Sequence, residues 1–277
     1  MKIGIVGLGL IGGSIAKAIK QNTEHEVLGT DLLESVIRKA LLLEAIDARL
    51  TDESVGQRDM MILALYPGAA VEFVKEHQRD FKKGAIVIDC CGVKEAVCAE
   101  IQPIAAENGF TYVGGHPMAG IEFSGFEHSR KNLFRHASMI LTPQADMRIQ
   151  DMELLKKLWL SLGFDHVQIS TPAEHDKIIA YTSQLAHVVS SAYVKSDASL
   201  KHKGYSAGSY RDLSRVAKLN ESMWTELFLL NRDNLAEEID GLIGRLLQYR
   251  DAIKEGNEKD LWTLLHEGTE RKLLIDG

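Results

Sequence analysis

The chain opens with Lys2-Ile3-Gly4-Ile5-Val6-Gly7-Leu8-Gly9-Leu10-Ile11-Gly12-Gly13-Ser14, a short apolar strand followed by a glycine-rich turn and the start of a helix. The glycines have the G-x-G-x-x-G spacing of dinucleotide-binding folds. In that motif Gly7 permits a tight turn, Gly9 lets a pyrophosphate approach the backbone, and Gly12 allows the helix to pack closely on the strand. The amides of Leu10, Ile11 and Gly12 at the helix N-terminus then offer free donors to the phosphates.

An acidic residue follows the second expected strand, Glu26 to Gly29. Asp31 lies about 20 residues beyond the turn, where a carboxylate can accept both ribose hydroxyls of the adenosine half. A carboxylate there would also repel a 2′-phosphate, which favours NAD over NADP. Two alternatives stay open: Arg38 could serve NADP, and Asp31 could be the N-cap of a helix that starts at Leu32.

Composition narrows the class of protein. The 277 residues are 45% hydrophobic, enough for a large core in one or two domains, and the net charge of −7 disfavours nucleic acid as a partner. No apolar run reaches the roughly 18–20 residues that span a bilayer, and the chain begins with a strand, so we expect neither membrane attachment nor a signal peptide. Cys90, Cys91 and Cys98 form no C-x-x-C pair. We therefore expect no disulfide framework, no metal site and a cytoplasmic location.

The first half of the chain alternates expected strands with expected helices. The strands are Met60 to Leu65, Ala85 to Asp89, Tyr112 to Gly114, Ala137 to Leu141 and His166 to Gln168, and the helices are Glu34 to Glu44, Ala70 to Gln78, Lys94 to Asn108 and Asp146 to Leu162. This alternation predicts an α/β fold with a Rossmann-type, doubly wound parallel sheet, whose ligand crevice lies beyond the carboxyl ends of the strands. The segments that end at Asp31, Leu65-Tyr66-Pro67, Asp89 and Gly114-Gly115 are expected to face that crevice, with Leu65, Tyr66 and Pro67 in contact with the cofactor.

From Thr171 onward the pattern is helical. Thr171-Pro172-Ala173-Glu174 predicts a helix start, with Thr171 as the N-cap, proline at the first helical position and Glu174 completing a capping box. We expect a dinucleotide-binding domain over residues 1–170 and an all-helical domain over 171–277, with one clear break at Gly204 to Ser209. The leucine-rich helices Leu227 to Leu247 and Leu261 to Leu274 need partners, which favours a homodimer built through this domain; a self-contained bundle is the alternative.

A histidine follows the expected strand in Gly114-Gly115-His116-Pro117-Met118-Ala119-Gly120-Ile121-Glu122-Phe123-Ser124-Gly125. It lies where nicotinamide chemistry is expected, and a histidine near its usual pKa can take a proton from a substrate hydroxyl as hydride leaves the same carbon. Gly114, Gly115 and Gly120 suggest that the backbone approaches a ligand closely. The alternative is a structural histidine packed beside the glycines.

A second polar cluster interrupts the apolar run from Ile178 to Val189. Ser183 and His187 are four residues apart and therefore share a helix face. Polar groups that conflict locally with burial tend to mark function. A core histidine bonded to Ser183 stays open as the alternative.

A third cluster is Gly208-Ser209-Tyr210-Arg211-Asp212-Leu213-Ser214-Arg215-Val216-Ala217-Lys218. Arg211 and Arg215 lie on one helical face, where two like charges repel each other unless an anion lies near them. The planar guanidinium group suits carboxylates, so a substrate with two carboxylates would explain both residues. The alternative is a solvated basic face paired with Asp212 and Glu221.

Taken together, these motifs resemble the prephenate dehydrogenase family, which includes arogenate and cyclohexadienyl dehydrogenases. The matches are the glycine turn, Asp-Cys-Cys-Gly-Val-Lys at 89–94, His-Pro-Met-Ala-Gly at 116–120, Ser-Gln-Leu-Ala-His at 183–187, and Tyr-Arg-Asp at 210–212 leading to Arg215 and Met223-Trp224. The resemblance implies that the chain oxidises prephenate with NAD, releases carbon dioxide and yields 4-hydroxyphenylpyruvate for tyrosine biosynthesis. The choice between prephenate and arogenate stays open.

The resemblance also implies roles for single residues. His116 would take the proton of the ring C4 hydroxyl, Arg215 would bind the ring carboxylate, and His187 and Arg211 would lie near the pyruvyl side chain. The substrate site would be completed by Gly208, by Glu122 at its mouth and by Trp224, from the same chain or the partner subunit.

One position departs from the family pattern. Gly92, in the expected cofactor site, stands where the family often has a serine whose hydroxyl touches the catalytic histidine and the substrate hydroxyl. A water, Cys91 or a backbone group must therefore take that role.

Two other functions stay open. A different two-domain dehydrogenase, acting on a 3-hydroxy acid, would place a catalytic lysine on the helix that links the domains. That helix carries His187 at its middle and Lys177 near its start. A non-catalytic NAD-sensing module would leave His116 and the two arginines without a task.

Overall fold

The computed structural model describes residues 1–121 and 123–276, and it contains one eight-stranded sheet. The strands are β1 (Lys2–Val6), β2 (Glu26–Thr30), β3 (Ala48–Arg49), β4 (Met60–Leu63), β5 (Ile86–Asp89), β6 (Thr111–Pro117), β7 (Ser138–Thr142) and β8 (His166–Ile169). Their order across the sheet is β3-β2-β1-β4-β5-β6-β7-β8. This order places the glycine turn after β1 next to the end of β4, near the middle of the sheet.

The sheet is parallel from β3 to β6, which confirms the expected doubly wound α/β fold, with one departure. β7 pairs antiparallel with β6, and β8 pairs parallel with β7. The connection from β6 to β7 carries a short 3-10 turn, Phe126–His128, in place of an α-helix. Parallel neighbours are usually joined by a helix that crosses over the sheet, and this link instead returns β7 beside β6 in the opposite direction.

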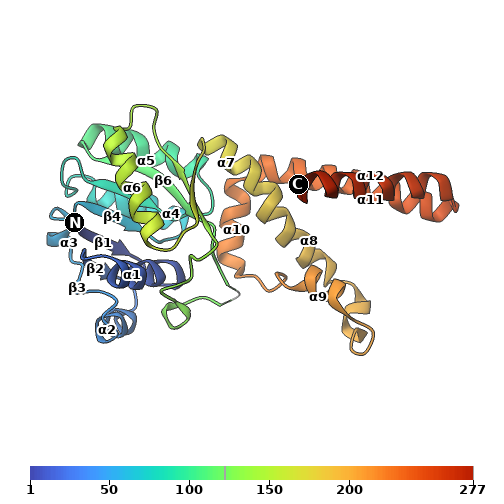
Figure 1. Cartoon of the computed structure of the whole chain (residues 1–277), viewed down its shortest axis with the longest axis horizontal. Helices are drawn as coiled ribbons and strands as arrows, with labels where there is room; N and C mark the ends of the chain where they lie inside the picture. Colours follow the sequence, from blue (N-terminus) through green and yellow to red (C-terminus); the bar gives the residue numbers. More distant parts are fainter. Residues whose placement is uncertain (122, 277) are drawn as a thin grey trace.

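Helices cover both faces of the sheet (Figure 1). They are α1 (Leu10–Asn22), α2 (Glu34–Leu42), α3 (Asp52–Val55), α4 (Pro67–His77), α5 (Glu95–Asn108) and α6 (Ile149–Ser161). Alternate strand residues face opposite cores: Ile62 packs with α1 and α6, and Leu63 packs with α4 and α5. The two-residue β3 and the four-residue α3 were not expected, because such short elements carry no periodic pattern.

From Pro172 onward the described elements are helical. They are α7 (Pro172–Ile179), a π-helical turn η2 (Ala180–Leu185), α8 (Ala186–Tyr193), a 3-10 turn η3 (Asp197–Lys201), α9 (Gly208–Ser214), α10 (Glu221–Leu230), α11 (Arg232–Glu255) and α12 (Glu258–Asp276). Thr171 caps α7 as expected, because its hydroxyl oxygen accepts the Glu174 amide at 3.2 Å. The Glu174 carboxylate accepts the Ser170 hydroxyl, so the predicted return bond of the capping box is replaced.

The expectation of one continuous leucine-rich helix over Leu227 to Leu247 is wrong. Asn231 separates α10 from α11 with a non-helical backbone, φ −117° and ψ 29°. Its side-chain amide donates to the Asp176 carbonyl and to Gln184 Oε1, both at 2.8 Å. These two buried bonds fix the corner, so Gly204 to Ser209 is not the single break in the helical region.

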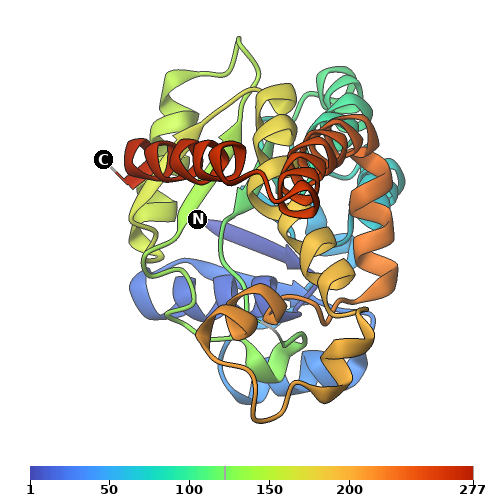
Figure 2. The same ribbon diagram turned by 90° about the vertical axis from the view of Figure 1, so that its right-hand side faces the viewer.

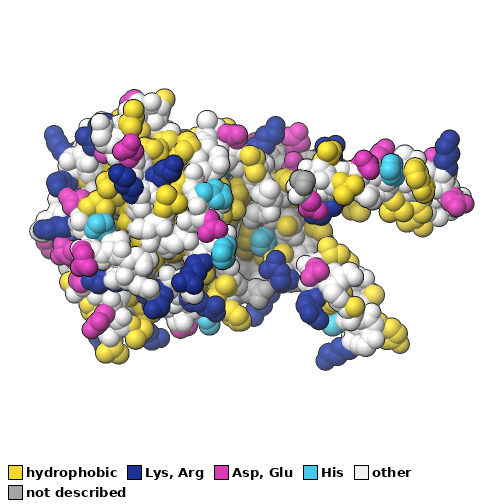
Figure 3. Space-filling model, viewed as in Figure 1, with side chains coloured by type: hydrophobic (Ala, Val, Ile, Leu, Met, Phe, Trp, Pro, Cys, Tyr) yellow, Lys and Arg dark blue, Asp and Glu magenta, His cyan; other side chains and the backbone are white. Residues whose placement is uncertain are grey.

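Two projections extend from the helical region (Figures 1 and 2). One is formed by α11 and α12, and the other by the segment through η3 and α9. Both carry large exposed apolar side chains: Leu200, Tyr205, Leu213, Ile243, Leu246, Trp262, Leu265, Leu273, Leu274 and Ile275. Figure 3 shows hydrophobic surface, in yellow, on both projections. A self-contained bundle would cover these groups, so the exposed surface favours association with a second chain. Within the described residues, no helix is both long and apolar enough to span a membrane.

Candidate active site

The glycine turn has the geometry that the sequence predicts. Gly7 has φ +85°, and a side chain there would strike the Ala64 carbonyl. A Cβ at Gly12 would collide with the Gly7 carbonyl and lie 2.9 Å from Ala64 Cβ. At Gly9, the N-cap of α1, a Cβ would meet no described atom within 4 Å. Two glycines therefore hold the turn against the end of β4, while the third leaves open space above the helix N-terminus.

Asp31 ties this turn to the next loop. Its Oδ2 accepts the Leu8 amide at 2.8 Å, and its Oδ1 accepts the Leu33 amide at 3.0 Å. The N-cap of α2 is Leu33, so the alternative in which Asp31 caps a helix from Leu32 is wrong. Arg38 pairs with Glu34 at 3.4 Å on the exposed face of α2.

The residues after β4 lie at the same edge of the sheet as the glycine turn. Leu65 packs against that turn, since its Cδ2 lies 3.0 Å from where a Cβ of Gly7 would be. Tyr66 is the N-cap of α4, and Pro67 begins the helix. The next amide, that of Gly68, donates to Glu226 Oε1 of α10 at 2.7 Å, which joins this edge to the helical region.

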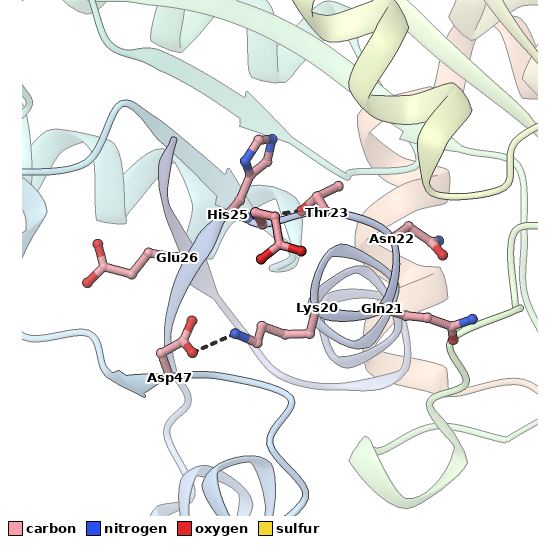
Figure 4. Close-up of a pocket in the computed structure, with 8 residues that line it drawn as sticks. Lys20, Gln21, Asn22, Thr23, His25, Glu26 and Asp47 are labelled. Atoms are coloured by element: carbon pink, nitrogen blue, oxygen red, sulfur yellow. Dashed lines mark hydrogen bonds and ion pairs between the residues drawn. The ribbon is translucent and has the colours of Figure 1, made fainter.

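The hollow drawn in Figure 4 lies at the amino ends of the parallel strands, opposite to the end that carries the glycine turn. It is lined by Lys20, Gln21, Asn22, Thr23, Glu24, His25, Glu26 and Asp47, from the C-terminal end of α1 and the amino end of β2. Lys20 and Asp47 form an ion pair at 2.6 Å across it. The glycine turn (Gly7 to Gly12) and the residues after β4 lie at the other end of these strands, which we call the nucleotide edge. The polar hollow is therefore separate from the nucleotide edge.

The strand that carries His116 is longer than expected. β6 continues to Pro117, so Gly114 and Gly115 lie inside the strand and His116 pairs with Ile140 of β7. A Cβ on Gly114 would lie 2.9 Å from Cys98 Sγ, and one on Gly115 would lie 2.8 Å from Met139 Cε. These two glycines therefore allow close internal packing, and the expectation that they face a ligand is wrong.

Asp89 also does not face the crevice, contrary to expectation. Asp89 and Lys94 form a fully buried ion pair, and the Lys94 ammonium also donates to the Gly115 carbonyl at 2.6 Å. The Tyr112 hydroxyl donates to Asp89 Oδ2 at 2.6 Å. Burial is the largest influence and opposes the charge on Lys94, but the charge and hydrogen bond of Asp89, together with Cys91 and Cys98, outweigh it and raise the pKa of Lys94. The network locks the end of β5 to the middle of β6.

His116 contacts two residues of α7. Its Nδ1 lies 2.9 Å from His175 Nε2, and His175 Nδ1 lies 2.7 Å from Asp176 Oδ1. Burial holds the pKa of His116 well below its usual range, and the positive charge of the nearby Lys94 lowers it further. His116 is therefore a neutral imidazole at neutral pH, the protonation state that a general base requires.

Gly92 borders the His116 ring. A Cβ at this position would lie 3.9 Å from His116 Cε1 and 3.5 Å from Leu227 Cδ2. The neighbouring Cys91 thiol is buried and donates to the Leu65 carbonyl at 3.5 Å. Burial raises its pKa well above the usual range. No described hydrogen bond joins the Cys91 thiol to His116.

His187 lies in a second part of the site. Its ring packs on Trp224 of α10, with centroids 4.0 Å apart, and its Nδ1 donates to the Ser183 carbonyl at 2.8 Å. Burial lowers the pKa of His187, and the nearby charge of Arg215 lowers it further. The structure thus brings His187, Trp224 and Arg215 of the same chain together. The histidine does bond to Ser183, through the backbone carbonyl.

Arg211 and Gly208 lie on α9, both exposed. The neighbouring Tyr210 ring packs between His202 and Tyr193, which joins α9 to α8. Among the described residues, no ion pair joins Arg211 to Asp212 or Glu221, which counts against the alternative of a paired basic face. No described contact links Arg211 or Gly208 to His116 or His187.

Lys177 and Glu122 are the last two residues that the sequence singled out. Lys177 is exposed on α7, next to the buried Asp176, so it is directed away from the packed side that reaches His116. This disfavours a lysine-dependent hydroxyacid dehydrogenase. Glu122 lies outside the described residues.

Comparison with known proteins identifies the family. The model "Prephenate dehydrogenase, nucleotide-binding domain" matches residues 15–197, and "Prephenate dehydrogenase, dimerization domain" matches residues 171–267. The chain belongs to the prephenate dehydrogenase family. It is 33% identical to a prephenate dehydrogenase of Lactococcus lactis over 86% of this chain and 67% of that protein. It is 30% identical to a cyclohexadienyl dehydrogenase of Zymomonas mobilis over 91% and 88%.

A solved structure agrees with this assignment. The crystal structure of prephenate dehydrogenase from A. aeolicus in complex with hydroxyphenyl propionate and NAD+ superposes with a TM-score of 0.88 and is 29% identical. The match covers 99% of this chain and 98% of that one. Membership of the prephenate dehydrogenase family therefore extends over both the sheet and the helical region.

The sequence interpretation missed His175 and Asp176 as members of the site. They lie in the first half of the helix that Thr171 begins, just after the capping residues. The sequence did offer one signal for them: two adjacent polar residues, His175 and Asp176, within a short amphipathic helix. Its partner, His116, is 59 residues away in the sequence, so no local pattern could pair them.

Proposed function

We propose that this chain oxidises and decarboxylates prephenate to 4-hydroxyphenylpyruvate with NAD+, a step of tyrosine biosynthesis. The observation that carries the proposal is the neutral His116 on β6, bordered by Gly92 and held through its Nδ1. A second group, His187, Trp224 and Arg215, supplies aromatic and cationic side chains for an acidic ring substrate. Family membership supports the same reaction.

The nucleotide edge fits NAD. Gly7 and Gly12 shape a cradle that side chains would fill, and Gly9 with the amides of Leu10 and Ile11 would hold the pyrophosphate. The Asp31 carboxylate oxygens keep further acceptor capacity for the ribose hydroxyls.

The other half of the cofactor would lie near Leu65, Tyr66, Pro67 and Gly92. NAD is favoured over NADP because Asp31 would repel a 2′-phosphate, and Arg38 is paired with Glu34. When bound, NAD+ supplies the two-electron acceptor for the substrate carbon.

The side chains have complementary tasks in the reaction. His116 would accept the proton of the C4 hydroxyl at Nε2 as C4 is oxidised to the ketone level. Arg215 would hold the ring carboxylate through charge-assisted hydrogen bonds. The electron pair of the bond to that carboxylate then moves into the ring, carbon dioxide leaves, and the ring becomes aromatic. His187, Trp224, Arg211, Gly208 and Glu122 would complete the site around the side chain.

Arogenate is the second candidate substrate. It differs from prephenate by an amino group in place of the side-chain keto group, and the Zymomonas relative is named a cyclohexadienyl dehydrogenase. The substrate preference is decided where the side chain binds, at a distance from His116. The proposal favours prephenate because the Lactococcus relative, 33% identical to this chain, is named a prephenate dehydrogenase.

One assay tests these assignments. The purified protein is given prephenate or arogenate with NAD+ or NADP+, and formation of the reduced cofactor is followed by absorbance. We expect the highest kcat/KM for prephenate with NAD+. Higher kcat/KM for arogenate would assign the second candidate, and no turnover of either substrate would refute the proposed activity.

We propose further that the chain is a homodimer through residues 171–277, with residues 1–170 as the dinucleotide-binding domain. The exposed apolar side chains of α11, α12 and the η3–α9 segment, together with the dimerization-domain match, support this. Light scattering should give twice the chain mass of 30.7 kDa. A monomer at micromolar concentration would contradict it.

A further inference from the structure

His175 and Asp176 are buried titratable groups that the proposed reaction does not itself use. Their side chains are 0% and 1% exposed. They belong to α7, in the helical region, yet they contact β6 and the start of α5. They therefore connect the catalytic histidine to the other half of the molecule.

Asp176 is held as a hydrogen-bond acceptor. Its Oδ1 accepts the Lys94 amide at 2.7 Å, and its Oδ2 accepts the Glu95 amide at 2.9 Å. These amides open α5, where the helix dipole also favours a carboxylate. The Asp176 carbonyl is fixed in turn by Asn231 at 2.8 Å. A carboxylate with these partners presents only acceptor sites to His175.

The proton positions follow from this fixed acceptor. His175 Nδ1, 2.7 Å from the carboxylate, must carry the proton of that bond. Burial lowers the pKa of His175, although Asp176 acts in the opposite direction, and a neutral His175 then has a lone pair on Nε2. His116 Nδ1, 2.9 Å away, must therefore donate. The His116 ring keeps its remaining lone pair on Nε2, which makes no hydrogen bond with any described residue.

The charges around His116 come from three elements. Lys94 of α5 faces it, but this ammonium is paired with Asp89 of β5. From α7 come His175 and, behind it, Asp176. When His116 gains a proton on Nε2, its Nδ1–H bond to His175 strengthens, and Asp176 supplies the balancing negative charge.

We propose that His175, oriented by Asp176, is a positioning residue that fixes His116 in the Nδ1–H tautomer and so makes Nε2 its proton-accepting atom. The catalytic consequence rests on the proposed function, whereas the tautomer itself does not. The arrangement makes the base competent only when α7 is docked against β6.

The tautomer can be measured in the intact wild-type protein without substrate. Histidine side chains are labelled with 15N, and the His116 signals are identified by their loss in His116→Asn. We expect Nδ1 to be protonated and Nε2 to be unprotonated at neutral pH. An Nε2–H tautomer would overturn the proposal, whatever activity the enzyme has.

A pair of variants tests the catalytic consequence. His175→Leu keeps the bulk but removes the acceptor, whereas His175→Gln keeps an oxygen that can accept from His116 Nδ1. Misplacing a reacting group by an ångström can reduce rate about 10²-fold, so we expect His175→Leu to lose about that much in kcat with an unchanged KM for NAD+. The fall of kcat at low pH (its acid limb) should also move to lower pH in His175→Leu. Protonated His116 loses its hydrogen-bond acceptor in this variant, so the pKa of His116 falls. His175→Gln should recover most of the kcat.

A purely structural role gives a different result. If His175 is only structural, both His175→Leu and His175→Gln should yield less active enzyme, and the acid limb of kcat should stay at the same pH. That pattern would overturn the proposal. If His175→Leu does not fold, the wild-type tautomer and the rate of His175→Gln still decide. An active enzyme with the wrong tautomer would refute this inference alone, and a correct tautomer without prephenate turnover would refute the proposed function alone.

Discussion

The two ends of the candidate active site are built in opposite ways. Around His116 the polar groups are buried and bonded to one another, from the Asp89–Lys94 pair to the His175–Asp176 pair. Around Arg211 and Arg215 the chain is a short helix between loops, and both side chains are exposed. The proposed proton-accepting end is therefore preorganised in a single chain, whereas the proposed carboxylate-binding end is exposed.

Replacing the base should have the largest effect. His116→Asn keeps a polar side chain of similar size but removes the group that accepts the proton, so turnover should fall roughly 10²–10⁴-fold. Binding of NAD+ should be unchanged, because the glycine turn and Asp31 are untouched. Steady-state kinetics with prephenate and a fluorescence titration with NAD+ check the two parts. Turnover within a few-fold of wild type would show that His116 is not the base.

Breaking the buried ion pair should be the next largest change, and it should appear in stability. Lys94→Met leaves Asp89 buried without its counter-charge, which costs about 3–5 kcal/mol. The matched control is Lys20→Met, which breaks the partly exposed pair with Asp47 and should cost under ~1 kcal/mol. Urea unfolding gives both values. Equal losses would show that the Asp89–Lys94 pair adds nothing to the rigidity of the preorganised end.

The open end should affect substrate affinity more than turnover. Arg215→Ala removes a charge-assisted contact of about 1.5–3 kcal/mol, so KM for prephenate should rise about 10–10²-fold while KM for NAD+ stays constant. Arg211→Ala should have the smaller effect, because only Arg215 is close enough to lower the pKa of His187. Initial rates measured at varied concentrations of prephenate and of NAD+ give the two Michaelis constants separately for each variant. Equal rises in both Michaelis constants would indicate a folding defect.

Adding a hydroxyl beside His116 should have the smallest effect. Gly92→Ser places a Cβ at ordinary contact distance from Leu227 and His116, so the free energy of unfolding should change by less than about 1 kcal/mol. A new hydrogen bond to the substrate hydroxyl, worth about 0.5–1.5 kcal/mol, would raise kcat by roughly 2–10-fold. Gly92→Ala is the control without the hydroxyl. If alanine and serine give the same kcat, the hydroxyl has no role here.

The sequence predicts the parts of the site that local chemistry determines. Gly7 and Gly12 can be assigned from spacing, because each is required by a steric contact within a few residues or with the adjacent strand. His116 can be proposed because it comes directly after the apolar run predicted to form a strand, although the strand itself continues through His116 to Pro117. The N-cap role of Thr171 is equally local.

What the sequence does not predict depends on contacts between distant segments. The roles of Gly114 and Gly115 are decided by Cys98 and Met139, and the break at Asn231 is decided by Asp176 and Gln184. The antiparallel β7 results from a connection without a helix. The His116–His175 contact joins two structural regions, so neither the strand pattern nor the helix pattern contains it.

The central claim is that His116 is a neutral base held ready at the preorganised end, and the pH dependence of kcat/KM for prephenate tests it most directly. Because burial holds the pKa of His116 well below its usual range, His116 stays unprotonated as the pH falls, and it gains its proton only at lower pH. We therefore expect kcat/KM to be maintained through pH 6.5, the unperturbed histidine pKa, and to fall only below it, with this limb absent in His116→Asn. An acid limb centred above pH 6.5, or one that persists in His116→Asn, would contradict the account.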